Sequence, residues 1–216
     1  MTVQVIEEMK PPRPDLMREC PPGKIQPIIF WPDDRLAIPS QELPPEAFGT
    51  FLDQLVADLV TTMYMTGGIG LSAIQIGAPF SVFVADLFYQ QGVKGPNQLL
   101  VAVNPVVEPV GQGEVVHQEG CLSFPGVQEV VPRAPEAVIR GRSRTGEPFR
   151  IKVGGMMARV VQHEMDHLQG KTFLDRMKPL AKRSAIKNVK RFHAGVRSDS
   201  VRVNPPNKKL PRRAHR

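Results

Sequence analysis

Residues 162–167 read Gln162-His163-Glu164-Met165-Asp166-His167, and this stretch predicts both a helix and a metal site. Positions four residues apart lie on one face of a helix, so the imidazoles of His163 and His167 can reach a single metal ion. Glu164, next to the first ligand, can take a proton from a water molecule at that ion. Chance would place this pattern in roughly one of 150 shuffled chains, so we interpret it as a metal-binding helix. Asp166 is expected on the helix surface or as a hydrogen-bonding support for a ligand.

A third ligand is needed, because a catalytic metal site usually takes three protein ligands and keeps one open position. The chain after His167 offers no well-spaced His or Glu, and the candidate lies upstream in Glu119-Gly120-Cys121-Leu122-Ser123. A cysteine such as Cys121, taken alone, is about twice as often a small buried hydrophobic residue as a ligand. Together with the helix motif, a thiolate ligand is the better explanation.

Hydrophobic spacing outside the motif predicts two more helices. The clearer one covers residues 45–65, where apolar side chains recur at steps of three and four. Its predicted buried face consists of Phe48, Phe51, Leu52, Leu55, Val56, Leu59, Val60 and Met63. The metal-binding helix is expected from about residue 155 to 170, and a basic helix over residues 180–193. The last of these places Leu180, Ala185, Ile186, Val189 and Phe192 along one side.

Short apolar runs separated by Gly and Pro predict strands, several of them antiparallel. The expected strands are residues 25–31, 80–85, 99–103, 127–131, 137–140 and 149–153. Strands and helices that do not alternate regularly indicate an α+β fold. We expect a catalytic domain over residues 25–193, a Pro-rich extended arm over residues 1–24 and a basic, disordered tail over residues 194–216.

The segment that follows the first helix, residues 68–75, reads Gly-Ile-Gly-Leu-Ser-Ala-Ile-Gln. Its glycines let the backbone approach a ligand closely. It lacks the third glycine of a dinucleotide-binding fingerprint and follows a helix, and it has no lysine of a phosphate-binding loop. Taken alone, this segment is best interpreted as a helix-to-strand turn.

Composition limits the classes of protein that remain. With 216 residues the chain fits one domain, and two cysteines make a poor disulfide framework, which favours a reducing compartment. The N-terminus lacks the pattern of a secretory signal or transit peptide, and no apolar run approaches the length of a membrane span. We therefore expect a cytoplasmic protein without a membrane partner.

The positive charge, +7 overall, is concentrated near the C-terminus. Residues 171–216 hold 15 Lys and Arg against two acids, whereas the preceding 170 residues carry 13 basic and 19 acidic side chains. Such a segment suits a polyanion such as RNA, or it is a solvated tail.

The three segments together resemble the peptide deformylase family. Its three motifs occur in order as GIGLSAIQ (68–75), EGCLS (119–123) and QHEMDH (162–167), and the resemblance covers about residues 25–193. Two departures are visible. Ser72 stands where the family more often has alanine, and Gln128 stands where many members have arginine.

The resemblance implies antiparallel sheets packed around the metal-binding helix, and a ferrous ion held by Cys121, His163 and His167. By their chemistry these ligands equally suit zinc, nickel or cobalt. It also implies that water bound to the metal attacks the formyl group of an N-terminal formyl-methionine, with Glu164 as general base and acid. Gln75 and the backbone N–H of Leu122 are expected to stabilise the oxyanion.

The resemblance further implies that the substrate is a formyl-methionyl nascent peptide held like an added strand. Its backbone would bind Ile69, Gly70 and Gly120, and its methionine side chain would contact His117, Met156 and Val160. In bacterial deformylases the C-terminal helix can dock on the ribosome, and helix 180–193 occupies the matching place. No DNA partner is expected.

Two other functions remain open from the residues alone. A zinc endopeptidase shares the His-Glu-x-x-His helix, but it would need the third ligand that is missing downstream. An RNA- or ribosome-binding protein with a structural metal would explain the basic helix, although the chain lacks interleaved aromatic residues for RNA stacking.

Overall fold

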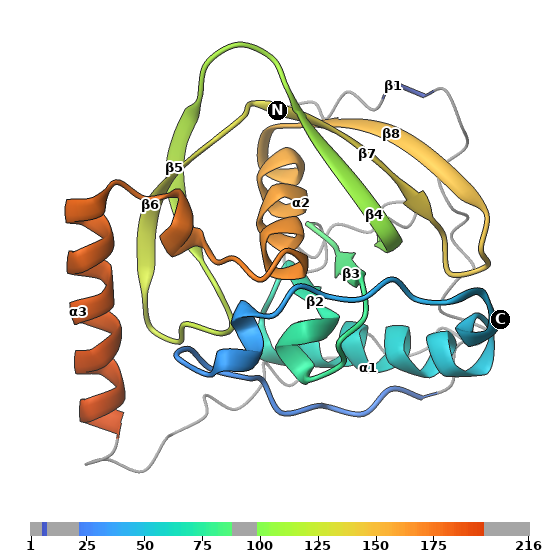
Figure 1. Ribbon diagram of the computed structural model, residues 1–216, viewed down its shortest axis with the longest axis horizontal. Coiled ribbons are helices and arrows are strands. Elements are labelled where there is room, and N and C mark those ends of the chain that lie inside the picture. Colours follow the sequence, from blue (N-terminus) through green and yellow to red (C-terminus); the bar gives the residue numbers. More distant parts are fainter. Residues whose placement is uncertain (1–5, 8–21, 88–98, 197–216) are drawn as a thin grey trace, which may run out of the picture.

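The computed structural model describes residues 6–7, 22–87 and 99–196, which form two antiparallel sheets and three α-helices (Figure 1). Most of the predicted arm and residues 197–216 of the predicted tail lie outside the described residues. Within those ranges the α+β fold is confirmed. None of the helices in the described part of the chain is long and apolar enough to cross a membrane.

The larger sheet has six strands in the order β1-β8-β7-β4-β3-β2, and the smaller sheet is the hairpin β5-β6. All neighbouring strands in both sheets are antiparallel, as expected. The strands are β1 Ile6–Glu7, β2 Gly70–Ser72, β3 Val82–Ala85, β4 Leu100–Val110, β5 Val115–Gly120, β6 Gln128–Arg133, β7 Glu136–Arg142 and β8 Pro148–Gly154.

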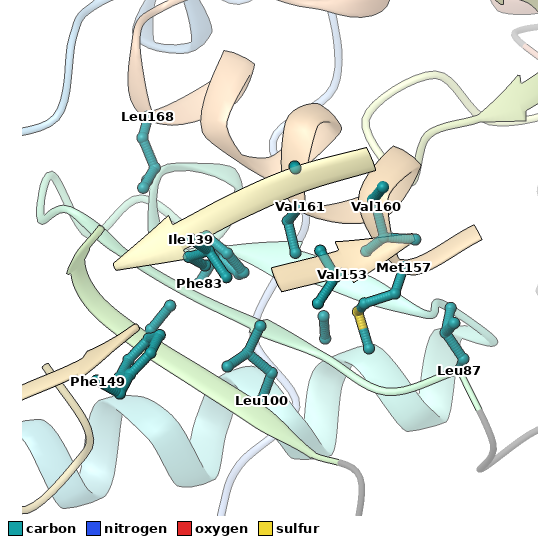
Figure 2. Packing of buried hydrophobic residues seen from close by; sticks show 14 residues of the cluster. Phe83, Leu87, Leu100, Ile139, Phe149, Val153, Met157, Val160, Val161 and Leu168 are labelled. Carbon is teal, nitrogen blue, oxygen red and sulfur yellow. The ribbon is translucent and has the colours of Figure 1, made fainter. Parts of the chain in front are cut away.

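Helix α2, Gly155–Leu168, follows β8 directly and lies between the larger sheet and the β5-β6 hairpin (Figure 1). Its apolar stripe packs into the main core with side chains from β3, β4, β7 and β8 (Figure 2). The helix contributes Met157, Ala158, Val160, Val161 and Leu168 to this cluster. The opposite side of α2 carries the polar residues of the motif toward the hairpin, which places the site between the two sheets.

Helix α1, Thr50–Thr66, packs its apolar face beneath β2 and β3 and stops at Gly67, whose φ of +76° suits a glycine C-cap. Two details of its prediction were wrong. The helix begins at Thr50, because Gly49 has a φ of +92° and separates it from a short 3₁₀-helix, Pro45–Ala47. Phe51 is 49 % exposed and packs edge-on against Phe80 instead of entering the core.

The strand expected over residues 25–31 does not form. The segment is extended, but its backbone hydrogen bonds go to two different partners: Ile29 N–H donates to Gln75 O (2.8 Å) and Trp31 N–H donates to Ser123 O (3.0 Å). It therefore fastens together two of the three motif segments. Parts of the predicted N-terminal arm, residues 1–24, also contact the predicted catalytic domain. Strand β1 pairs with β8, and Lys24 N–H donates to the Asp58 carboxylate (2.8 Å).

Helix α3, Pro179–Val196, lies beside β6 at the edge of the molecule (Figure 1). It buries Ala185 and Val189 in a small cluster with Phe124, Val127 and Val131. Leu180, predicted on the same face, is 78 % exposed because it lies in the first turn of the helix, ahead of the residues that pack.

Candidate metal and catalytic site

Cys121, His163 and His167 come together at the end of the β5 strand. Cys121 follows β5, and both histidines lie on α2 one turn apart. Their ligand atoms all lie within 4.8 Å of one another, with Cys121 Sγ 3.2 Å from His167 Nε2. One thiolate and two imidazoles in such a cluster form a donor set that suits a divalent ion of borderline softness.

The hydrogen bonds of the two histidines agree with a metal-binding role. His163 Nδ1 donates to Glu119 Oε2 (2.9 Å), a contact that orients the ring and leaves the other nitrogen for a metal. His167 is fully buried, and its Nδ1 has no hydrogen-bond partner among the described residues. The other ring nitrogen, Nε2, is the one that faces Cys121 Sγ (3.2 Å), so it is placed to bind the same ion as the thiol, and the residues present fit a metal ion.

Buried charges behind the ligands form a connected network. Glu119 accepts hydrogen bonds from His163, Arg133 and Arg159. Burial opposes the charged form of Glu119, but the hydrogen bonds from His163 and Arg133 outweigh it and hold the pKa of Glu119 well below its usual range. Arg133 also donates to Asp166 (2.5 Å).

Asp166 is not on the helix surface: it is 1 % exposed and also accepts hydrogen bonds from Arg176. The alternative reading, a buried residue that supports the ligands through hydrogen bonds, describes it better. Asp166 is connected to the ligand His163 through two residues. Arg133 donates to both Asp166 and Glu119, and Glu119 accepts from His163.

Glu164 is buried beside the ligands, and its two oxygens face different neighbours. The Ser72 hydroxyl donates to Oε2 (2.9 Å). Oε1 lies against Gly70, where a Cβ atom would approach it to 2.5 Å, so a larger residue at this position would displace the carboxylate. Burial raises the pKa of Glu164 to about 7.

Gln75 is held in one orientation from both ends of its amide. It lies in a short 3₁₀-helix, Ala73–Ile76, and its Oε1 accepts from Ser72 N–H (3.0 Å). Its Nε2 donates to Ser123 Oγ (3.0 Å) and lies 3.5 Å from Cys121 Sγ. The amide donor is therefore directed toward the ligand cluster.

A cavity of about 890 Å³ opens over this cluster. Ten of the twelve predicted site residues line it: Ile69, Gly70, Gln75, Gly120, Cys121, Leu122, Met156, Val160, His163 and Glu164. His167 lies buried beneath it, whereas His117 is exposed and is not among the lining residues. Arg159 lines the cavity as well, and it had no role in the prediction.

The family model of polypeptide deformylases matches residues 25–183. The chain belongs to the polypeptide deformylase family. It is 35 % identical over 168 residues to the peptide deformylase of Aquifex aeolicus, a match that covers 78 % of this chain and 96 % of that protein. It is 42 % identical over 131 residues to the enzyme of Syntrophobacter fumaroxidans, covering 61 % of this chain and 75 % of that one.

Solved deformylase structures share the fold. The crystal structure of the Legionella pneumophila enzyme superimposes with a TM-score of 0.73 at 32 % identity, over 82 % of this chain and all of that one. The structure of the Synechococcus elongatus deformylase in complex with actinonin superimposes with a TM-score of 0.68 at 32 % identity. The match covers 76 % of this chain and 86 % of that one. Deformylases are metal-dependent hydrolases that remove the formyl group from the N-terminus of nascent proteins, and this chain is such an enzyme.

Proposed function

We propose that Cys121, His163 and His167 hold one ferrous ion and that Glu164, Gln75 and Leu122 carry the deformylation of formyl-methionyl peptides at that site. The observation that carries the proposal is that the three ligand atoms lie within 4.8 Å of one another, beside a cavity that Cys121, His163 and Glu164 line. When bound, the ion acts as a Lewis acid that polarises the formyl carbonyl and makes water more acidic.

The protein's own groups handle the proton and the developing charge. Glu164 accepts a proton from the attacking water and returns it to the departing amine, which completes general base and general acid catalysis with one carboxylate. The Gln75 Nε2–H group and the backbone N–H of Leu122 donate hydrogen bonds to the oxygen that becomes negative. The fixed amide of Gln75 supports this role, because a preoriented donor of this kind contributes about 2.7–4 kcal/mol.

The peptide backbone is proposed to bind between two strand edges that pair with no other strand in the described part of the chain. Gly70 belongs to β2, the last strand of the larger sheet, and Gly120 ends β5, one of the two strands of the hairpin. Both glycines line the cavity, as does Ile69, so an extended peptide can pair with backbone on either side. Met156 and Val160, on the first turns of α2, are proposed to contact the methionine side chain; His117 lies outside this wall.

Formate release tests the proposal directly. Protein purified without oxygen and assayed for metal is expected to release formate from formyl-Met-Ala-Ser in proportion to its bound metal. The same peptide without the formyl group, and an internal peptide bond in a longer substrate, should remain intact. Cleavage of the internal bond would instead favour an endopeptidase, and no release from metal-loaded protein would overturn the assignment of this site.

We also propose that the catalytic domain spans residues 25–193 and that the enzyme works in the cytoplasm, at the ribosome. Support for the last point is a stripe of exposed cations on α3: Arg183, Lys187, Lys190 and Arg191. These positions share one helical face, opposite the buried Ala185 and Val189. Such a surface suits the phosphates of ribosomal RNA.

Reversing charges on this stripe is expected to weaken ribosome binding without affecting catalysis. Truncating α3 would uncover Phe124 and Val127 of the cavity wall, so substitutions are the cleaner test. The double variant Lys187→Glu/Arg191→Glu should bind ribosomes several-fold more weakly in a sedimentation assay, with a flatter salt dependence. Its activity on formyl-Met-Ala-Ser should be unchanged. The control is Arg142→Glu/Arg150→Glu, which makes the same change in charge on β7 and β8. An equal loss of ribosome binding in this control would mean that net charge, and not the stripe on α3, determines the affinity for ribosomes.

A further inference from the structure

The β5-β6 hairpin carries part of the site but is not part of the larger sheet. Its first strand, β5, ends at Gly120, directly before Cys121, and the backbone around this point forms one side of the cavity. A hairpin of two strands is marginally stable by itself, so its position relative to α2 must be fixed by other contacts. That position decides how far Cys121 lies from His163 and His167, and how wide the cavity is.

Arg159 makes contacts of this kind from α2. One guanidinium nitrogen donates to Glu119 Oε1 (2.6 Å) and to the backbone carbonyl of Val131 on β6 (2.9 Å). The other terminal nitrogen donates to the backbone carbonyl of Val115, the first residue of β5 (2.6 Å). A single side chain, 7 % exposed, therefore binds the first residue of β5, the residue before Gly120 at its end, and the neighbouring strand β6.

The same guanidinium is coupled to the metal ligands through Glu119. Arg159 lies one helical turn before His163, and both donate to this carboxylate, Arg159 to Oε1 and His163 to Oε2. Glu119 itself precedes Cys121 by two residues. The carboxylate thus receives hydrogen bonds from the helix that supplies two ligands, and it belongs to the strand that leads directly into the third, Cys121.

Only arginine suits this arrangement. Its planar fork presents donors in several directions from one rigid group, whereas the single nitrogen of lysine cannot span the carbonyl of Val115 and the carboxylate of Glu119 at once. A buried cation is also costly unless its hydrogen bonds are satisfied, so an apolar residue would be the simpler choice if this position only packed.

We propose that Arg159 is a positioning residue that docks the β5-β6 hairpin on α2 and thereby sets both the Cys121-to-histidine geometry and the width of the peptide-binding cavity. It does not touch the reacting atoms. The inference rests on the proposed ligand set and on the proposed binding of peptide at Gly120.

The test compares Arg159→Met and Arg159→Lys with the control Arg140→Met. Arg140 lies on β7 and pairs with Glu108 at the surface (3.0 Å), so the control removes a paired arginine outside the hairpin. Metal-free protein is titrated with Co²⁺, and the thiolate-to-cobalt absorption reports the contact of Cys121 with the ion. KM and kcat for formyl-Met-Ala-Ser are measured on the iron-loaded forms.

The expected result is a 10- to 100-fold weaker Co²⁺ affinity in Arg159→Met, with a shifted thiolate band and a KM raised more than kcat is lowered. A general loss of folded protein would lower kcat and leave KM and the band unchanged, which separates positioning from stability. Arg159→Lys should lie between Arg159→Met and the wild type, and it decides the matter if the methionine variant does not fold. The control should match the wild type.

Wild-type Co²⁺ affinity, absorption and KM in both Arg159 variants would overturn the inference. A wild-type protein that binds Co²⁺ without any thiolate band would instead count against Cys121 as a ligand, and so against the proposed site rather than against the role of Arg159.

Discussion

Replacing Glu164 with alanine is expected to lower kcat for formyl-Met-Ala-Ser by about 10²–10⁴-fold while the metal stays bound. The carboxylate lies beside the ligand cluster, lines the cavity and receives a hydrogen bond from Ser72, so it is placed to move a proton without being a ligand itself. Glu164→Gln should behave similarly, because its amide oxygen can still accept from Ser72 but the group cannot take a proton.

The measurement is kcat and metal content on the same preparation, with Glu147→Gln as a control. Glu147 is an exposed carboxylate in the β7-β8 turn, and its loss should leave both quantities unchanged. Near wild-type kcat in the metal-loaded Glu164 variants would remove Glu164 as general base. Loss of metal together with activity would show that the carboxylate supports the site instead.

Replacing Cys121 with serine is expected to cost the enzyme its metal or to exchange it for a different one. A thiolate is a soft, anionic ligand, whereas a serine hydroxyl stays protonated near neutral pH and binds a divalent ion weakly. Two histidines alone make a poor catalytic site, so activity should fall with metal content.

Metal per chain, measured after purification from iron-supplemented cells and again after dialysis against a chelator, tests this expectation. Cys20→Ser removes the only other cysteine of the chain and serves as the matched control. Unchanged metal content and rate in Cys121→Ser would take Cys121 out of the ligand set. The same loss in Cys20→Ser would point to a general sensitivity to thiol loss.

The sequence predicted the parts of the fold that depend on local spacing. Helix α2 and its pair of histidines follow from a four-residue period, and the core positions of α1 follow from the same rule. Both patterns repeat within one or two helical turns, so spacing alone was enough to find them; Phe51, which packs against Phe80, is the exception. The family motifs then identified Cys121 and Gln75 as partners that the structure brings to α2.

Features that depend on distant partners could not be predicted. The segment 25–31 has the composition of a strand, yet its N–H groups bond to Gln75 and Ser123 rather than to one neighbouring strand. β2 has only three residues and β5 mixes polar with apolar side chains, so neither gave a strand signal. The role inferred for Arg159 was hidden because a cation on a helix is most simply explained as a solvated side chain.

The outer edge of β2, which pairs with no second strand among the described residues, also bears on self-association. Unpaired N–H and C=O groups along a strand can template another chain, and folded proteins usually cover or interrupt such edges. Here β2 exposes an edge of three residues, shorter than the five or six residues of a typical strand, at the wall of a cavity. An edge of this length offers enough backbone groups to hydrogen-bond the end of one peptide. It offers too few for stable strand pairing between two folded copies, which would lead to aggregation.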